Sequence, residues 1–400
     1  MKVLVVNAGS SSLKYQLFDT AANTVLAKGI CERIKIDGRI THKLPDGRKV
    51  AKEIPMPDHA VATQIVIDYL TDPEYGCIKD MSEIEAVGHR VVHGGTYFTK
   101  STLVTEDVVE KLKKCVDFAP LHTPAHIMGI EGCTKAMPTV PQVIVIDTAF
   151  HQTMPPQAYT YAIPYEMSKE YEIRRYGAHG TSHRFVAAEM CKLLGHTENT
   201  KIVTCHIGNG SSITAVKDGK CVDTSMGMTP LAGVMMGTRC GDIDPAVVTY
   251  IMKKTGKTPD EMSDFMNNEC GFLGVSGISS DSRDIEAAIL ENNERAYLTA
   301  STLAYQVKKY IGSYAAAMNG LDAVVFTAGM GENNPELRER ACADMEYLGI
   351  KINKEVNAKA HHQSDIVELS PPDSKVKVYL IPTNEELMIA RDTEEIVSAL

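Results

Sequence analysis

Three glycine-flanked loops carry side chains that could handle a phosphate or a carboxylate. Arg90 ends a strand-like run before a glycine pair, His179 lies between two glycines just before an expected helix, and Arg239 lies in a tight loop. Phosphoryl transfer needs donors and cations aimed at the charge that develops on the phosphate oxygens. A guanidinium group also matches a carboxylate or phosphate with two parallel hydrogen bonds. An arginine in such a loop is more often structural, so these residues are candidates that need support from other motifs.

Two glycine–serine turns occupy corresponding places in the two halves of the chain. Asn7 to Ser12 joins the strand-like runs 3–6 and 13–18, and Gly208 to Ser212 joins 202–207 and 213–217. Small residues let backbone N–H groups approach a polyphosphate without a Cβ in the way. A single turn of this kind is usually a plain hairpin. Two of them, half a chain apart, predict a duplicated fold that grips a nucleotide between its halves.

A third glycine-rich stretch, Ala328 to Asn334, follows the apolar run 322–327, and Pro335 then opens an expected helix. Glycines between a strand end and a helix start allow a flat ring or a phosphate to come close. An ordinary strand–helix loop explains the stretch equally well in isolation. Beside two phosphate-type turns, it becomes a candidate adenosine site.

Carboxylates at strand ends are the candidate metal and catalytic groups. Asp147 ends the run 142–147, although a helix cap or loop anchor fits it as well, and Asn384 to Glu386 follow the run 376–381. Mg²⁺ takes one or two carboxylates and completes its shell with water and phosphate. Two histidine pairs have i,i+4 spacing, but neither forms H-E-x-x-H and a proline interrupts one, so zinc is disfavoured.

Composition limits the classes of protein that remain. The length of 400 residues predicts two or three domains, and the formal net charge of −10 argues against nucleic-acid binding by bulk electrostatics. Ten scattered cysteines without a C-x-x-C pair indicate reduced thiols. Neither a secretory signal nor an 18-residue apolar stretch is present, which predicts a soluble, cytoplasmic protein without membrane contact.

Strand and helix signals alternate along the chain, which favours an α/β fold. Further strands are expected at 84–92, 142–147, 322–327 and 376–381, and helices at 59–70, 124–136, 183–194, 246–254, 336–345 and through most of 282–319. Asp244 is expected to cap one helix and Thr181 or Ser182 another. The opening order, strand–turn–strand, argues against a P-loop or Rossmann start. A domain boundary is expected near 148–166.

Taken together, the motifs resemble those of the acetate kinase family over essentially the whole chain: N-A-G-S-S-S-L-K, H-R-V-V-H-G-G, P-L-H-T-P, D-T-A-F-H, H-G-T-S-H, G-N-G-S-S, G-T-R-C-G-D-I-D-P, G-M-G-E-N and T-N-E-E-L. The resemblance implies two duplicated domains of the ribonuclease H-like actin and sugar kinase ATPase fold, with the active site in an interdomain cleft. The expected domains are residues 1–150, completed by 384–400, and residues 151–383, the latter for nucleotide binding and dimerisation. It also implies a homodimer that transfers phosphate reversibly between ATP and acetate with Mg²⁺, or Mn²⁺ in its place.

Carried over by motif, the resemblance assigns roles to particular residues. Asp147, His179 and Arg239 are the implied catalytic residues, and Arg90 the residue that binds the acetate carboxylate. Asn7 and Glu385 are the implied metal-site residues. The acetate methyl group is expected against Val92, Leu121 and Pro230. The implied ATP-binding residues are Lys14, His206, Ile207, Gly208, Asn209, Gly210, Asp281, Ser282, Arg283, Gly329, Met330, Gly331, Glu332 and Asn333.

The chemistry of a carboxylate acceptor makes these roles reasonable. With a pKa near the roughly 4 of Asp and Glu, acetate is already an anion at pH 7 and needs no base. The difficulty is that the acetate anion must approach the anionic γ-phosphate, and nearby cations reduce the repulsion between the two. We therefore expect Asp147 to orient groups or the metal rather than to remove a proton.

One departure from the family pattern lies beside His179. Position 178 is Ala, where the family pattern has Phe in Gly-Phe-His. The smaller side chain predicts a roomier carboxylate pocket, weaker acetate binding and relaxed chain-length preference. A propionate or butyrate kinase of the same family is therefore the nearest alternative. A nucleotide-driven switch of the actin or chaperone type is the alternative from another class, and it would have no carboxylate site.

Overall fold

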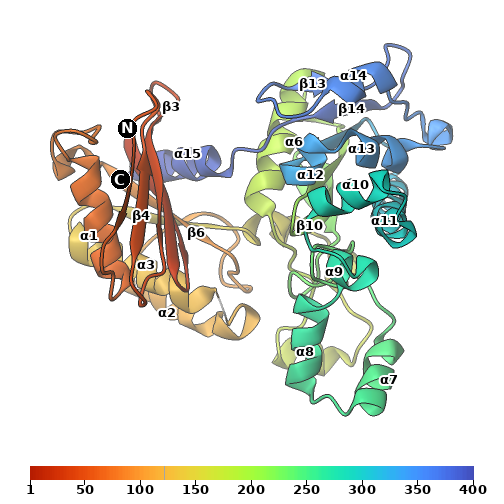
Figure 1. Ribbon diagram of the computed structural model, residues 1–400, viewed down its shortest axis with the longest axis horizontal. Coiled ribbons are helices and arrows are strands. Elements are labelled where there is room, and N and C mark those ends of the chain that lie inside the picture. Colours follow the sequence, from red (N-terminus) through yellow and green to blue (C-terminus); the bar gives the residue numbers. More distant parts are fainter. Residues whose placement is uncertain (121) are drawn as a thin grey trace. The chain divides into compact units, whose positions relative to one another are not determined.

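The computed structural model describes residues 1–120 and 122–400. They form an α/β protein of two compact units, Met1–Phe150 with Asn384–Leu400, and His151–Thr383 (Figure 1). The first is called here the N-terminal unit and the second the C-terminal unit. Each has its own sheet and core.

An eight-stranded sheet forms the N-terminal unit. Its order is β5 (Lys49–Glu53), β4 (Arg39–Lys43), β3 (Thr24–Glu32), β2 (Ser12–Asp19), β1 (Lys2–Gly9), β6 (Ala86–Val91), β8 (Gln142–Ile146) and β7 (Thr102–Leu103). Strand β1 is antiparallel to β2 and parallel to β6, which is parallel to β8. The side chains of Leu13, Tyr15 and Leu17 alternate into the core, as the period of a strand requires.

Helices cover both faces of this sheet. A Cβ added at Gly129 of α3 (Thr123–Ala136) would meet Ala8, and one added at Gly88 would meet Ile389 of α15 (Glu385–Val397). Val5 pairs with Gly88, and because side chains alternate along β1, Ala8 points to the face opposite Val5. Helices α3 and α15 therefore lie on opposite faces. Helix α1 (His59–Leu70) packs beside α3, and α2 (Glu106–Lys114) also contacts α3.

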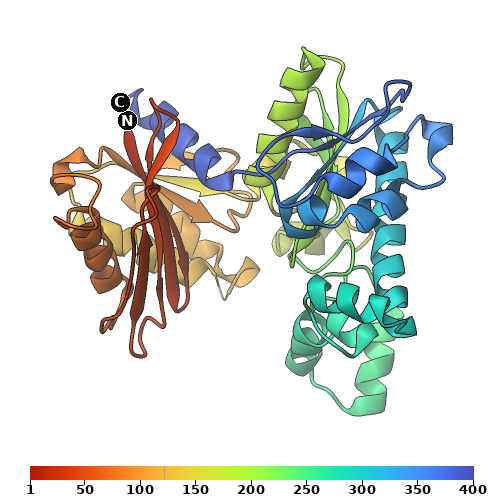
Figure 2. The ribbon, with the colours of Figure 1, turned by 45° about the horizontal axis from the view of Figure 1, so that its top comes forward.

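A six-stranded sheet forms the core of the C-terminal unit. Its order is β11 (Lys220–Thr224), β10 (Ser211–Lys217), β9 (Lys201–Ile207), β12 (Ala323–Thr327), β14 (Lys377–Leu380) and β13 (Val367–Glu368). The long helix α11 (Glu294–Met318) packs on the face that carries Val203 and Cys205 (Figure 2). Helix α6 (Gly180–Leu194) contacts Thr204 and His206 on the other face.

The two sheets share one pattern. The strands β3, β2, β1, β6 and β8 correspond in order and direction to β11, β10, β9, β12 and β14. Each run has three antiparallel strands followed by two parallel ones. The duplication predicted from the two turns is thus present as a complete five-strand unit.

The remaining elements connect these layers. They are α4 (Pro156–Tyr159), α5 (Tyr165–Glu170), α7 (Pro245–Thr255), α8 (Pro259–Asn268), α9 (Gly271–Ser276), α10 (Ser282–Leu290), α12 (Ala328–Asn333), α13 (Pro335–Cys342) and α14 (Lys354–Lys359), with short 3₁₀ turns at Met81–Glu83, Val116–Phe118, Ala149–Thr153 and Glu346–Leu348. All ten cysteines are free thiols. Across residues 1–120 and 122–400, no helix is long and apolar enough to cross a membrane.

Three local predictions were wrong. Helix α6 begins at Gly180, not 183, and its N-cap is His179, whose φ of 57° is left-handed, rather than Thr181 or Ser182. The stretch Ala328 to Asn333 is the short helix α12 and not an open glycine loop. Asn7 lies within strand β1, because the turn is only Ser10 and Ser11. Asp244 does cap α7, with its side chain accepting from the Ala246 N–H.

Candidate active site

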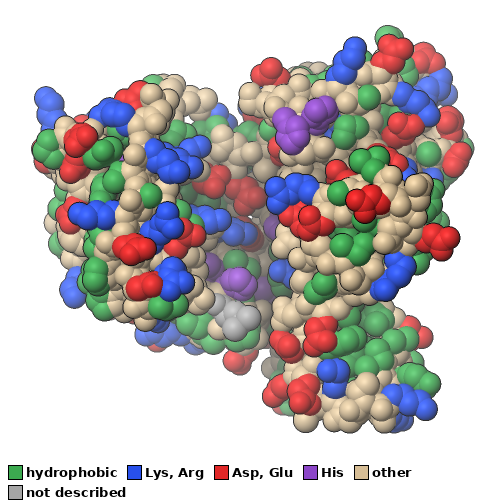
Figure 3. Space-filling view, in the orientation of Figure 1, with side chains coloured by type: hydrophobic (Ala, Val, Ile, Leu, Met, Phe, Trp, Pro, Cys, Tyr) green, Lys and Arg blue, Asp and Glu red, His purple; other side chains and the backbone are tan. Residues whose placement is uncertain are grey.

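The first motif places Asn7 and Lys14 side by side. They are register partners on β1 and β2, so their side chains share one face of the sheet. That face is hollowed beside them and also carries Lys28 and Lys43, while Glu386 of helix α15 lines the same hollow. Figure 3 shows Lys and Arg side chains interspersed with Asp and Glu side chains on the visible face of the N-terminal unit. A cationic sheet face beside an amide suits phosphate oxygens.

Arg90 and Asp147 meet at the carboxyl ends of two parallel strands. Arg90 lies in β6 and Asp147 directly follows β8, with its N–H donating to the carbonyl of Val91 over 2.9 Å. Arg90 Nη2 donates to Asp147 Oδ2 over 2.6 Å, and Nε lies 3.5 Å from Oδ1. Asp147 is 1% exposed and Arg90 24% exposed. The carboxylate is thus buried under a guanidinium group that reaches solvent.

A second carboxylate approaches the same arginine. Glu385 Oε2 lies 3.9 Å from Arg90 Nε, and Glu385 opens helix α15, whose N-cap is Asn384. The pKa of Glu385 is raised to about 7, chiefly by burial; Arg90 opposes this rise, and the charges of Asp147 and Glu386 contribute to it. Carboxylates therefore outnumber the arginine here, and a cation would relieve their repulsion.

The oxygen donors fit magnesium in kind. Carboxylate and amide oxygens from Glu385, Asp147 and Asn7 are hard ligands of the type that Mg²⁺ prefers. Among the described residues, no group of three or more His, Cys, Asp or Glu side chains is arranged to hold a metal by itself. A magnesium ion here would complete its shell with phosphate and water, as is usual for this metal.

The structure describes two of the three residues expected to contact the acetate methyl group, Val92 and Pro230. Val92 is half-buried and its N–H donates to His126 Nε2 over 3.3 Å. Leu121 lies outside the described residues. Pro230 belongs to the C-terminal unit, where its carbonyl accepts from Arg239 Nη1 over 3.1 Å. The backbone of Pro230 is therefore hydrogen-bonded to Arg239, one of the catalytic candidates.

His179 and Arg239 converge on one glycine. A Cβ added at Gly210 would lie 3.5 Å from His179 Cε1 and Nε2 and 3.6 Å from Arg239 Nη1. The His179 ring stacks on His206, with ring centroids 4.1 Å apart. Burial lowers the pKa of Arg239. The turn between β9 and β10 thus lies beside an imidazole edge and a guanidinium group, an arrangement that would attract a phosphoryl group.

Most of the predicted nucleotide residues line one trough. The predicted residues that border this trough are Gly208, Asn209, Asp281, Ser282, Arg283, Gly329, Met330 and Asn333. The trough is also bordered by Ser280, Glu286, Asn334 and His362. Two predicted contacts are engaged elsewhere. Ile207 is buried in the core, and Glu332 Oε1 accepts from the backbone N–H groups of Ala328 and Thr383. Glu332 therefore anchors α12 instead of facing the trough.

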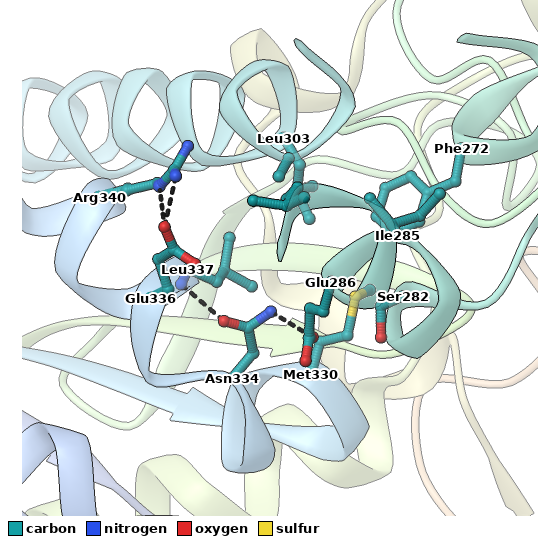
Figure 4. Close-up of a pocket in the computed structure, with 12 residues that line it drawn as sticks. Phe272, Ser282, Ile285, Glu286, Leu303, Met330, Asn334, Glu336, Leu337 and Arg340 are labelled. Carbon is teal, nitrogen blue, oxygen red and sulfur yellow. Dashed lines mark hydrogen bonds and ion pairs between the residues drawn. The ribbon is translucent and has the colours of Figure 1, made fainter. Parts of the chain in front are cut away.

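An apolar slot, drawn in Figure 4, shares lining residues with the trough. Phe272, Ile285, Leu303 and Leu337 form its walls, and Ser282, Glu286, Met330 and Asn334 belong to both hollows. Asn334 Nδ2 donates to Glu286 Oε1 over 2.7 Å, and burial raises the pKa of Glu286. Glycine turns at one end and an apolar slot at the other suit a ligand with a charged tail and a flat ring.

The chain matches the model of the acetokinase family over residues 2–391. The protein belongs to the acetokinase family. Acetate kinase of Methanosarcina barkeri is 56% identical over 99% of this chain and 97% of its own length. That of Thermoanaerobacter pseudethanolicus is 55% identical, with 100% of both chains covered.

Solved structures agree with this membership. Acetate kinase of Porphyromonas gingivalis has a TM-score of 0.96 at 48% identity, with 99% of each chain covered. A propionate kinase of Francisella tularensis has a TM-score of 0.90 at 39% identity and covers 98% of this chain and 99% of its own. The acetokinase family, the duplicated α/β fold and the phosphotransferase class predicted from the motifs are therefore confirmed.

Several residues of these sites escaped the sequence analysis. Glu286 lies four residues after Ser282 on α10, so helical spacing could have placed it beside the trough. Phe272 and Leu303 are far from any acetokinase motif quoted above and enter the slot only through packing. No local signal in the sequence identifies them.

Proposed function

We propose that this protein catalyses the Mg²⁺-dependent, reversible transfer of the γ-phosphoryl group of ATP to acetate, giving ADP and acetyl phosphate. The observation that carries the proposal is the convergence of His179 and Arg239 on Gly210. Both groups can donate to phosphoryl oxygens at a turn that offers no side chain of its own. The names of the acetate kinases to which the chain is similar support acetate as the acceptor.

In the proposed reaction an acetate oxygen attacks the γ-phosphorus in line. The new bond joins that oxygen to phosphorus, the bond to the β,γ-bridging oxygen breaks, and ADP leaves with the electron pair. No proton has to be removed, because acetate is ionised at pH 7. His179 and Arg239 would stabilise the charge on the equatorial oxygens, which is the main catalytic requirement in phosphoryl transfer.

Arg90 is the proposed acetate ligand. Its Nε and Nη2 face Asp147, which leaves the Nη1 edge to receive the acetate carboxylate. Val92, Leu121 and Pro230 remain the proposed contacts of the methyl group. Asp147 would hold the guanidinium group in place, which agrees with an orienting role.

Asn7 and Glu385, with Asp147 nearby, are the proposed magnesium ligands, and Mn²⁺ is the proposed substitute. When bound, the metal would neutralise charge on the transferring phosphate. Lys14 would contact the phosphates from the neighbouring strand, and the trough and slot of the C-terminal unit would hold the nucleotide. Glu332 is proposed to act by fixing α12, given its backbone contacts.

We further propose a cytoplasmic homodimer whose dimer contacts come from the C-terminal unit. Exposed apolar side chains on α7 and α11, including Tyr250, Tyr297, Leu298 and Tyr305, support this choice of unit. Light scattering after size exclusion would test the dimer. A mass of one chain, 43.7 kDa, at micromolar concentration would contradict it.

A hydroxamate assay tests the function directly. Full-length protein with ATP, Mg²⁺ and acetate should form acyl phosphate, and acetyl phosphate with ADP should form ATP. Loss of ATP without acyl phosphate would instead favour a nucleotide switch. Running propionate and butyrate in parallel decides the chain-length alternative, which the solved propionate kinase at 39% identity keeps relevant.

A further inference from the structure

A chain of hydrogen bonds runs behind His179. His179 Nδ1 lies 2.8 Å from Ser212 Oγ, which lies 2.7 Å from His183 Nε2. His183 Nδ1 lies in turn 2.7 Å from Thr204 Oγ1, which lies 3.4 Å from the carbonyl oxygen of Thr214. Ser212, His183 and Thr204 are completely buried. The contacts link the catalytic candidate to the interior of the sheet.

The direction of the hydrogen bonds follows from counting donors and acceptors. A carbonyl oxygen only accepts, so the Thr204 hydroxyl donates to Thr214 and accepts from His183 Nδ1–H. Burial, with His151 and His206 nearby, puts the pKa of His183 well below its ordinary value. A neutral His183 with its proton on Nδ1 has an acceptor at Nε2, which takes the Ser212 proton. Ser212 Oγ is then left to accept from His179 Nδ1.

The opposite edge of His179 faces the site. Its Cε1 and Nε2 lie next to Gly210, beside Arg239 Nη1. With the proton held on Nδ1, a neutral His179 would present a lone pair at Nε2 and repel phosphoryl oxygens. Only the imidazolium form, which has a proton on both nitrogens, can donate from Nε2.

We propose that His183 and Ser212 are positioning residues that hold a proton on His179 Nδ1, so that His179 donates to the phosphoryl group only as the imidazolium ion. The role given to His179 Nε2, donation to the phosphoryl group, rests on the proposed function. The position of the proton on Nδ1 does not depend on that function. Among the groups that face His179 are the His206 ring, the Arg239 guanidinium, Ser212 and, beyond it, His183. Activity should therefore fall as His179 loses its second proton.

The proton position can be read without substrate. Full-length protein labelled with ¹⁵N-histidine is studied by long-range ¹H–¹⁵N correlation over a pH series, and His179→Asn identifies the His179 signals by their loss. Neutral His179 should show a protonated Nδ1 and an unprotonated Nε2. Neutral His179 with its proton on Nε2 would overturn the inference.

Two serines of the same strand give a matched pair of variants. Ser212→Ala removes the acceptor, so neutral His179 should move toward the Nε2–H form, kcat should fall roughly 10- to 100-fold at low pH, and the decline at high pH should flatten. Ser211→Ala removes an equally buried hydroxyl that donates to the Gly208 carbonyl instead, so the His179 proton should stay on Nδ1. The same proton shift in both variants would overturn the proposal.

Different experimental results would contradict the inference and the proposed function. Formation of acetyl phosphate by a protein whose neutral His179 carries Nε2–H would overturn the inference and leave the function intact. His179 with Nδ1–H in a protein that makes no acyl phosphate would overturn the function, while the positioning by His183 and Ser212 would stand.

Discussion

Arg90 and Asp147 are paired where β6 and β8 end, with Arg90 Nη2 2.6 Å from a carboxylate that is 1% exposed. The arginine proposed to bind an anionic substrate is therefore already held by an internal anion. This pairing holds the Nε and Nη2 edge of the Arg90 guanidinium group and leaves the Nη1 edge directed away from Asp147. It gives Asp147 a role that needs no proton transfer.

Asp147→Asn should lower kcat/KM for acetate by roughly 10- to 100-fold, because a neutral amide holds the guanidinium less firmly and leaves its charge less balanced. The shape of the pH–rate profile should stay that of the wild type. Arg90→Lys keeps the charge but loses the two-point contact, and it should chiefly raise the acetate KM. Wild-type kinetics and metal affinity in Asp147→Asn would rule out an essential role for Asp147.

Glu385→Gln should make the protein more stable at pH 8 in the absence of Mg²⁺. The folded pKa of about 7 lies above the ordinary 4.5, so between these values the folded state binds more protons and stability falls as pH rises. Glutamine removes this loss, which amounts to about 3 kcal/mol at most. Thermal melts should show the gain at pH 8 and almost none at pH 4.

Glu386→Gln is the matched control for that variant, since it removes the neighbouring charge of the same helix turn and leaves Glu385 in place. It should give a smaller gain at pH 8. Glu385→Gln should also raise the Mg²⁺ concentration needed for half-maximal activity. An equal stability gain at pH 4 and pH 8 would contradict the titration of Glu385.

Gly210→Ala should lower kcat/KM for ATP by roughly 100-fold while leaving the melting temperature nearly unchanged. The added Cβ would make ordinary contacts of 3.5 and 3.6 Å with His179 and Arg239, so the fold can accept it. The same methyl group occupies the space proposed for the phosphoryl group. Gly312→Ala, within helix α11, should keep full activity and gain about 1 kcal/mol of stability.

Arg338→Met should destabilise the C-terminal unit by about 3 kcal/mol or more. The Arg338 side chain is completely buried, and it makes five hydrogen bonds, to the carbonyls of Gly331, Glu332, Asn357 and Ala360 and to Asn357 Oδ1. Methionine leaves these acceptors without a donor. Because Gly331 and Glu332 belong to α12, calorimetry should also find weaker ATP binding, and unchanged binding and stability would refute this role.

Ala178→Phe should change the ratio of kcat/KM for acetate to that for propionate. Ala178 is buried against Met226 and Met236, so a ring would have to displace flexible methionine side chains. We expect stronger discrimination against propionate with a modest loss of stability from overpacking. An unchanged ratio in a folded variant would refute the link between position 178 and chain length.

Much of the fold was predictable because its signals are local. The runs 13–18, 202–207 and 322–327 correspond to β2, β9 and β12, and the helix expected at 59–70 is α1. The hairpin β4–β5 was missed because its charged residues, such as Lys49 and Lys52, hide the alternation of a strand. The start of α6 was misplaced because His179 caps it through a left-handed backbone that its sequence does not signal.

The sequence by itself determined the family, the duplicated α/β fold and the set of side chains that meet anions, because motif spacing and hydrophobic period are properties of short segments. Only the tertiary structure decided which residues touch: Arg90 with Asp147, Lys14 beside Asn7, and Ser212 between two histidines. The tertiary structure also decided that the Glu332 carboxylate accepts from the Ala328 N–H of α12 and does not face the trough. Such pairings depend on strand register and packing between distant segments, which no local pattern records.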